Sequence, residues 1–381
     1  MSVSGKYAIV GVGESDVGQK LGRSGMALQL QAITRALTDS GLDKSAVDGV
    51  LGRASGGLAP NFSAVLAERL GIKPTYTSDI ALSGASSASM ILAAVAALEA
   101  GYCTTVLCVN GDAQTGRAER GGGPKSWIED FERPFGFIGA PVSYALPAQR
   151  HMYEYGTTSE QFGAIAVACR KHASLNPNAT FRELITIADH QASRMIADPY
   201  HLLDCCPNTD AAGAVIITSA ERARNLRQPP VYLLGLGQEN SHADVQYAKP
   251  MTATAMQGAS RQAYAMAGLG PKDIDVAELY DCFTYVVLVT LEDYGFCKKG
   301  EGGSFVEGGR IELGGELPVN TGGGLLSQGH ATGFLHITEG ATQMRGAAGA
   351  RQVANAQTAI VSGQCSVTGI NACLILGSHA N

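Results

Sequence analysis

One stretch of the chain, residues 77–101, constrains what the other residues can fold into. It opens with small and polar residues and continues as an alanine-rich segment that ends at Gly101, a residue type that commonly terminates helices. Because no polar side chain interrupts the run from Met90 to Leu98, the helix predicted here is apolar on every side and should be buried. The rest of the chain must therefore be arranged around this helix.

The start of this helix carries small polar residues, namely Ser83, Gly84, Ser86 and Ser87. The N–H groups at a helix N-terminus have no partner within the helix, and together with the helix dipole they favour negative charge. Two interpretations follow. The serines cap a core helix, or this end stabilises charge that develops on a bound substrate.

Composition limits the class of protein. The chain has 381 residues, of which 45% are apolar and 48 are glycine, values typical of an α/β enzyme with more than one domain-sized unit. The net charge of −6 argues against a nucleic-acid-binding surface. The sequence shows neither a signal-peptide pattern nor the roughly 18–20 consecutive apolar residues of a membrane span, so we expect a cytoplasmic protein.

The nine cysteines include no CxxC pair, which indicates reduced thiols and agrees with a cytoplasmic location. Cys205 and Cys206 are adjacent but lack further ligands at zinc-binding spacing. We therefore expect no metal site.

Strand and helix patterns alternate in two series that share an order. Strands are expected at 7–12, 47–51, 104–110, 210–218, 231–235, 275–279, 358–363 and 372–377. Between about 113 and 207 an insertion interrupts the alternation, with helices expected at 148–155, 159–174 and 181–188. A long helix is expected at 336–350. The two series divide the chain into an N-terminal half, 1–225, and a C-terminal half, 226–381.

Six motifs in combination carry a family resemblance: AIVGVGES near the start, ALSGASSAS before the central helix, VNGD at 109–112, NTDAAGAVI at 208–216, ELYDCFTY at 278–285 and GGGLLSQGHATG at 322–333. With them the chain resembles the thiolase superfamily, in the branch similar to the thiolase domain of sterol carrier protein. The resemblance implies an α/β thiolase fold of two βαβαβαββ halves in five layers (αβαβα), with a cap-like loop insertion. It also implies a tight homodimer and a CoA thioester as substrate, without a permanently bound cofactor.

The sequence departs from the family where thiolases keep their nucleophilic cysteine. Leu82 occupies the cysteine position in the turn before the central helix, and a leucine side chain cannot attack a thioester. The adjacent Ser83 could act as a nucleophile only with a base in hydrogen-bonding reach, and a capping role is the alternative. Leu82 is therefore expected to line the substrate pocket rather than to form an acyl-enzyme.

Three other motif positions supply candidate catalytic groups. Tyr280, followed by Asp281, stands where the family usually has the histidine of HDCF, and its hydroxyl can donate a hydrogen bond or relay a proton. Gly329 and His330 match the GHP motif, which makes His330 the strongest catalytic candidate. Cys365 lies near the position of the family's base cysteine, in an ambiguous register, and an inert thiol is the alternative.

Members of this branch that lack the cysteine and carry the tyrosine resemble the retro-aldolases of steroid side-chain degradation. The resemblance implies cleavage of a 3-hydroxyacyl-CoA into a shorter acyl-CoA and a ketone or aldehyde. Tyr280 would handle the hydroxyl proton, while His330 and helix N-terminal amides would hold the enolate oxygen. Two alternatives stay open: a 3-ketoacyl-CoA thiolase that uses Cys365, and a non-catalytic thiolase-fold subunit that binds acyl-CoA.

Those aldolases resemble one another in working with a small OB-fold subunit that carries a zinc ribbon and helps to hold CoA. A similar partner is plausible because the clustered cations of the insertion are few: Arg117, Arg120, Lys125 and Arg133. The insertion also carries aromatic residues that suggest room for a bulky acyl group, with loop packing as the alternative: Trp127, Phe131, Phe135 and Phe137.

Overall fold

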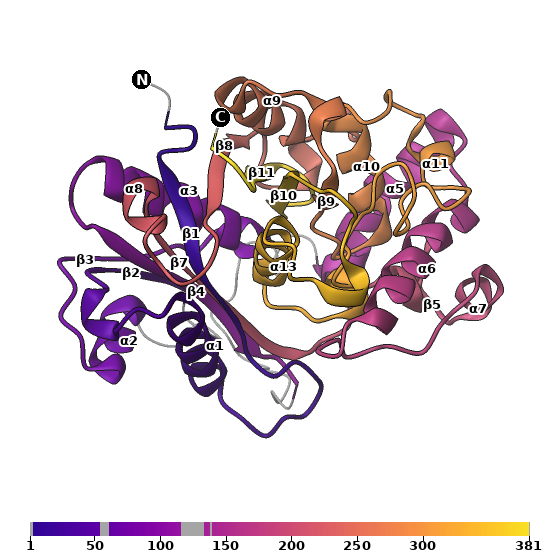
Figure 1. Ribbon diagram of the computed structural model, residues 1–381. Coiled ribbons are helices and arrows are strands. Elements are labelled where there is room, and N and C mark those ends of the chain that lie inside the picture. Colours follow the sequence, from indigo (N-terminus) through magenta and orange to yellow (C-terminus); the bar gives the residue numbers. More distant parts are fainter. Residues whose placement is uncertain (1–2, 54–60, 116–132, 138, 381) are drawn as a thin grey trace.

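The computed structural model describes residues 3–53, 61–115, 133–137 and 139–380 (Figure 1). Its centre is a nine-stranded mixed sheet with the order β3-β2-β4-β7-β1-β8-β11-β10-β9. The strands are β1 (Tyr7–Glu14), β2 (Gly49–Gly52), β3 (Tyr76–Asp79), β4 (Thr105–Ala113), β7 (Asp210–Ser219), β8 (Val231–Asn240), β9 (Val276–Glu278), β10 (Thr358–Cys365) and β11 (Ile370–Gly377). A separate two-stranded sheet consists of β5 (Met195–Ala197) and β6 (Tyr200–His201).

The helices cover both faces of the large sheet. They are α1 (Gly25–Ser40), α2 (Phe62–Leu70), α3 (Ser86–Glu99), α5 (Gly139–Tyr155), α6 (Ser159–Leu175), α7 (Ile187–Ala192), α8 (Ala220–Ala223), α9 (Met256–Ala267), α10 (Thr284–Asp293), α11 (Gly302–Phe305), α12 (Gly324–Ser327) and α13 (Phe334–Met344). Helices α1 and α9 pack on outer faces, whereas α3 and α13 contact each other and strands of both halves. The layers therefore run helix, N-terminal part of the sheet, helix, C-terminal part of the sheet, helix, as the resemblance implies.

The two halves follow one order of elements. From β1 to α8 the described chain forms a βαβαβαββ unit with an insertion after β4, and the division expected at residue 225 falls between α8 and β8. In the second unit the third strand is reduced to a single parallel bridge between Ala277 and Val319. The halves join through the antiparallel pairing of β1 with β8, which makes the sheet continuous.

Helix α3 is buried, as its composition predicts. The side chains of Met90, Ile91 and Ala94 have no exposed surface, and Val95 is 3% exposed. Its N-terminus is preceded by one 3₁₀ turn, Ser83–Ala85. The apolar run therefore does form the core element on which the two halves meet.

Three expected helices differ in extent. The helix expected at 181–188 is wrong, because Phe181 donates its N–H to the Ser327 carbonyl and the helical turn starts only after Thr186, whose side chain caps α7. Helix α5 begins at Gly139 rather than at 148 and includes Pro147. The helix expected at 336–350 spans only Phe334–Met344, because Gly346 adopts φ +65°.

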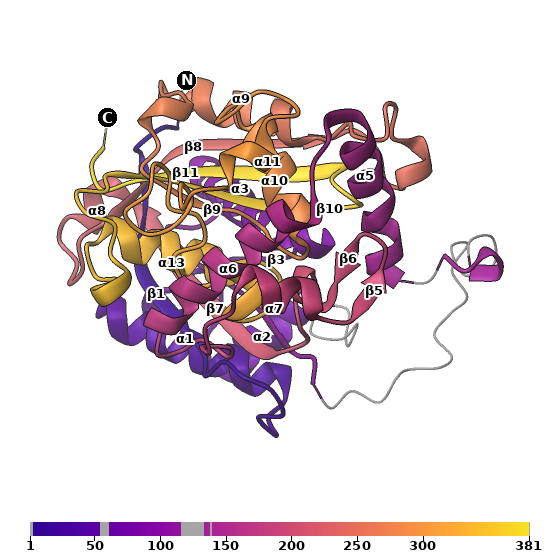
Figure 2. The ribbon, with the colours of Figure 1, turned by 90° about the vertical axis from the view of Figure 1, so that its right-hand side faces the viewer.

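The insertion lies between β4 and β7. Figures 1 and 2 show α5, α6 and α7 beside the C-terminal half, where α6 contacts α10 and α11. Arg117, Arg120, Lys125, Trp127 and Phe131 lie outside the described residues. No helix in the described part of the chain is both long enough and apolar enough to cross a membrane.

Candidate active site

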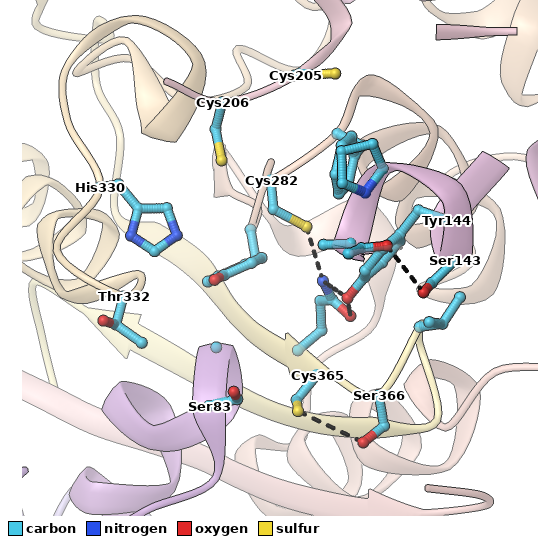
Figure 3. Close-up of a pocket in the computed structure, with 18 of the residues that line it drawn as sticks. Ser83, Ser143, Tyr144, Cys205, Cys206, Cys282, His330, Thr332, Cys365 and Ser366 are labelled. Atoms are coloured by element: carbon cyan, nitrogen blue, oxygen red, sulfur yellow. Dashed lines mark hydrogen bonds between the residues drawn. The ribbon is translucent and has the colours of Figure 1, made fainter. Parts of the chain in front are cut away.

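A cavity of about 1220 Å³ lies where the two halves and the insertion meet (Figure 3). Ser83, Tyr280, His330 and Cys365, which come from four separate motifs, all line it. Figure 3 shows His330 and Thr332 on one side, Cys206 and Cys282 on another, and Ser83, Cys365 and Ser366 on a third. The lining side chains are therefore rich in hydroxyl and thiol groups.

The turn before α3 forms one wall of the cavity. Ser83 and Gly84 line the cavity, whereas Leu82 is not among the lining residues. The N–H of Leu82 donates to the Ser86 hydroxyl at 2.8 Å. Among the described residues, the N–H groups of Ser83 and Gly84 donate no backbone hydrogen bond. Free donors are thus found one and two residues beyond the position where thiolases carry their sulfur.

Tyr280 is held closely against this turn. Its side chain is 4% exposed and its N–H donates to the Ser362 hydroxyl at 2.9 Å. A Cβ atom added to Gly84 would come within 2.5 Å of the Tyr280 hydroxyl and 2.2 Å of the Gln364 carbonyl oxygen, so glycine is required here. Burial, reinforced by the neighbouring Cys282, raises the pKa of Tyr280 well above its ordinary value. The phenol is therefore neutral at physiological pH.

Asp281 lies behind Tyr280 and does not line the cavity. Its Oδ1 accepts the N–H of Leu325 at 2.8 Å and its Oδ2 that of Leu326 at 3.2 Å, so it caps the short helix α12. The same Oδ1 lies 3.0 Å from His336 Nε2, and the His336 ring stacks on Tyr280 at 6.3 Å between ring centroids. Asp281 therefore holds the glycine-rich segment 322–333 in place next to Tyr280.

His330 lies in the glycine-rich segment 322–333 and lines the cavity. Its N–H donates to the Thr209 hydroxyl at 2.6 Å, and its Nδ1 lies 2.8 Å from Gln114 Nε2. With the Gln114 amide nitrogen facing it, Nδ1 can accept this hydrogen bond only in the neutral tautomer that carries its proton on Nε2. Burial lowers the pKa of His330, so the ring is neutral and Nε2–H is available as a donor. Gly329 does not line the cavity, and a Cβ added to it would lie 2.4 Å from the Val17 side chain.

Cys365 ends β10 at a strained hairpin. Its Sγ lies 3.5 Å from the Ser366 hydroxyl, and the next three residues, Ser366, Val367 and Thr368, all adopt positive φ. Such backbone strain in non-glycine residues is concentrated at functional sites. Figure 3 shows this thiol on the same side of the cavity as Ser83 and Ser366.

Sequence reasoning missed several lining residues. Gln364 is buried and donates through Nε2 to Cys282 Sγ at 3.1 Å, and its amide also bonds the Tyr144 hydroxyl. Gln114 follows the end of β4, but no local pattern marks it because its partner His330 lies 216 residues away. The only available signal was the position of Gln114 beside the VNGD motif, at a strand end where ligands commonly bind.

Comparisons with known proteins agree with this arrangement. Residues 237–378 match the family model described as "Thiolase C-terminal domain-like". The chain is 38% identical over 361 residues to a 17-hydroxy-3-oxo-4-pregnene-20-carboxyl-CoA lyase of Mycobacterium tuberculosis, covering 90% of this chain and 92% of that protein. It is 37% identical over 361 residues to a steroid side-chain-cleaving aldolase of Thermomonospora curvata, covering 90% and 91% respectively.

Among solved structures, that of an Ltp2-ChsH2(DUF35) aldolase superposes with a TM-score of 0.91 at 34% identity, over 99% of each chain. These similarities extend over nearly the whole chain and include both halves. The chain therefore belongs to the thiolase superfamily, in the branch similar to sterol-carrier-protein thiolases that includes steroid side-chain aldolases.

Proposed function

We propose that this chain cleaves a 3-hydroxyacyl-CoA by a retro-aldol reaction, giving a shorter acyl-CoA and a ketone or aldehyde. One observation carries the proposal: the position of the family's nucleophile is held by Leu82, whose side chain does not line the cavity and whose N–H is bonded to Ser86. The cavity nevertheless retains Tyr280, His330 and free backbone donors. The site therefore retains groups for proton transfer and charge stabilisation but lacks the family's acylation residue.

The reaction requires the transfer of the proton of the C3 hydroxyl and the stabilisation of the negative charge that develops on the thioester enolate. The bond between C2 and C3 breaks, its electron pair forms the thioester enolate, and the C3 hydroxyl loses its proton to become a carbonyl. The enolate is then protonated at C2. No covalent intermediate with the enzyme and no oxidant is required.

Tyr280 is proposed as the proton relay. As the C2–C3 bond breaks, the phenol oxygen accepts the proton that leaves the C3 hydroxyl while its own proton passes to C2, so this concerted transfer leaves the phenol neutral before and after the reaction. This agrees with the raised pKa of Tyr280, which disfavours a standing phenolate. The packing of its hydroxyl beside Gly84 keeps the relay at the N-terminus of α3.

The enolate oxygen is proposed to bind His330 Nε2–H together with the N–H groups of Ser83 and Gly84. Donors fixed before the reaction stabilise developing charge without reorganisation. Gln114 makes this possible by holding His330 in the tautomer with the proton on Nε2. Gln114 is thus a positioning residue.

The Gln114→Glu variant tests this assignment through its pH dependence. The carboxylate accepts Nδ1–H and raises the pKa of His330, so above that pKa the neutral ring has no proton on Nε2. We expect kcat to fall about 100-fold at pH 8 and to recover as the pH decreases and the ring regains its second proton. In the parent protein Nε2–H is present in both forms, so His330 adds no such dependence.

The measurement is kcat between pH 5.5 and 8.5. Gln262→Glu, which makes the same charge change on the exposed face of α9, is the control and should follow the parent profile. A Gln114→Glu profile parallel to the parent one would show that Gln114 does not select the tautomer.

A second candidate function is supported by Cys365, whose thiol lines the cavity. A thiolase that uses this sulfur would cleave 3-ketoacyl-CoA and form an acyl-enzyme. Turnover of a 3-hydroxyacyl-CoA and of a 3-ketoacyl-CoA, with the parent and a Cys365→Ser variant, separates the candidates. We expect cleavage of the hydroxy substrate only, retained in Cys365→Ser. Cleavage of the keto substrate that is lost in Cys365→Ser identifies a thiolase, and no turnover of either substrate, with and without a candidate partner subunit, identifies a non-catalytic subunit.

The proposed partners follow from the family resemblance and from the scarcity of positively charged side chains in the cavity. We propose a homodimer and a small second subunit with an OB fold and a zinc ribbon, and no permanent cofactor. The similar solved aldolase is named for two components, Ltp2 and ChsH2(DUF35). Among the described residues that line the cavity, Arg53 is the one lysine or arginine, which leaves little to hold the phosphates of CoA and supports a second subunit.

A further inference from the structure

The cavity extends beyond His330 to a wall formed at the ends of two parallel strands. Arg53 directly follows β2, and Asp112 and Gln114 lie at the end of β4. The two strands are parallel neighbours, with Gly52 paired with Val109. In α/β proteins ligands bind beyond the carboxyl ends of such strands. This wall is therefore placed to contact substrate.

The guanidinium of Arg53 can donate further hydrogen bonds at this wall. Its Nη1 donates to the Thr332 hydroxyl at 3.3 Å, and no ion pair among the described residues involves it. A guanidinium carries five N–H donors in a planar fork that matches a carboxylate. Asp112 lies on the same wall and keeps its negative charge there, and its Oδ1 accepts the N–H of Ala113 at 2.7 Å.

Arg53 is close to the reacting end of the cavity. Thr332 stands two residues after His330, and the positive charge of Arg53 contributes to the lowered pKa of that imidazole. The phosphates of CoA are separated from the thioester by the whole pantetheine arm. With the thioester oxygen at His330, an anion that reaches Arg53 must therefore belong to the acyl part of the substrate.

We propose that Arg53 and Thr332 form a subsite for a carboxylate carried by the acyl group, so that the substrate is the CoA thioester of a dicarboxylic acid. This inference rests on the proposed function because it assumes that a CoA thioester occupies the cavity. It adds a substrate class: an acyl chain whose far end is anionic rather than purely hydrocarbon.

Calorimetric titration with two matched pairs of thioesters tests the subsite without requiring turnover. Succinyl-CoA is compared with butanoyl-CoA, and glutaryl-CoA with pentanoyl-CoA, because each pair differs in a terminal carboxylate against a methyl group. The protein is used in the assembly in which it is isolated. We expect the carboxylate to improve affinity by about tenfold in at least one pair.

The Arg53→Met variant should lose this preference while binding the methyl-ended thioesters as before. Arg53→Lys should retain part of it, because a lysine keeps the charge but not the fork. Arg69→Met, at an exposed position in the last turn of α2, is the matched control and should behave as the parent. A thermal melt of each variant reports whether it folds.

Equal affinities within both pairs, or a preference that persists in Arg53→Met, would overturn the carboxylate subsite and leave the retro-aldol function standing. If none of the four thioesters binds, the subsite fails, and the turnover of a 3-hydroxyacyl-CoA decides the proposed function separately. The two failures are therefore distinct.

Discussion

The Tyr280→Phe variant is expected to cleave a 3-hydroxyacyl-CoA about 10³-fold more slowly than the parent, with its fold unchanged. The phenylalanine ring keeps the packing against Gly84, Gly333 and His336 but removes the hydroxyl that is proposed to exchange protons with C2 and the C3 hydroxyl. Because the Tyr280 hydroxyl makes no hydrogen bond within the described part of the chain, its removal leaves no protein group unpaired. The loss should therefore appear in kcat and not in stability.

Single-turnover measurements of product formation, together with thermal melts, would check this result. Tyr264→Phe is the matched control: this buried tyrosine of α9 donates its hydroxyl to the Tyr294 carbonyl at 3.2 Å, away from the cavity. The control should lose some stability and no activity. Full lyase activity in Tyr280→Phe would eliminate the relay and move the proton transfer to another group.

His330→Ala is expected to lower kcat by about 10² to 10³-fold, the effect of losing about 3–4 kcal/mol of transition-state stabilisation from one oxyanion donor. The binding of a substrate thioester should change less, because a ground-state carbonyl oxygen carries little of the charge that the enolate develops. The expected signature is therefore a fall in kcat with a nearly constant KM.

His330→Gln distinguishes a donor from a base at this position. A glutamine amide can donate an N–H to the enolate oxygen but cannot take up a proton, so it should recover part of the activity that alanine loses. His379→Gln, at an exposed position beyond β11, controls for the substitution itself. If glutamine is as inactive as alanine and a pH-dependent limb disappears with it, His330 acts as the base instead.

Much of the fold follows from local pattern. The apolar run from Met90 to Leu98 predicts a buried helix, because no face of it can meet water, and the alternation of strands and helices predicts the two halves. The helix expected at 181–188 is wrong because a capping box of Thr186 and Asp189 starts the helix at Ile187, while the N–H of Phe181 bonds to the distant carbonyl of Ser327, a contact that no local propensity encodes. Long-range backbone bonds of this kind override weak helical patterns.

The candidate site, too, was predicted in part from the sequence and decided in part by the tertiary structure. The sequence by itself determined that a leucine replaces the attacking sulfur at position 82 and that Tyr280 and His330 supply polar groups, because side-chain chemistry can be read at each position separately. Only the tertiary structure decided how these groups act. Gln114 meets His330 across 216 residues, and Arg53 meets Thr332 across 279 residues at the end of the cavity. Such pairings depend on how the two halves pack, and the spacing of residues along one chain does not contain that information.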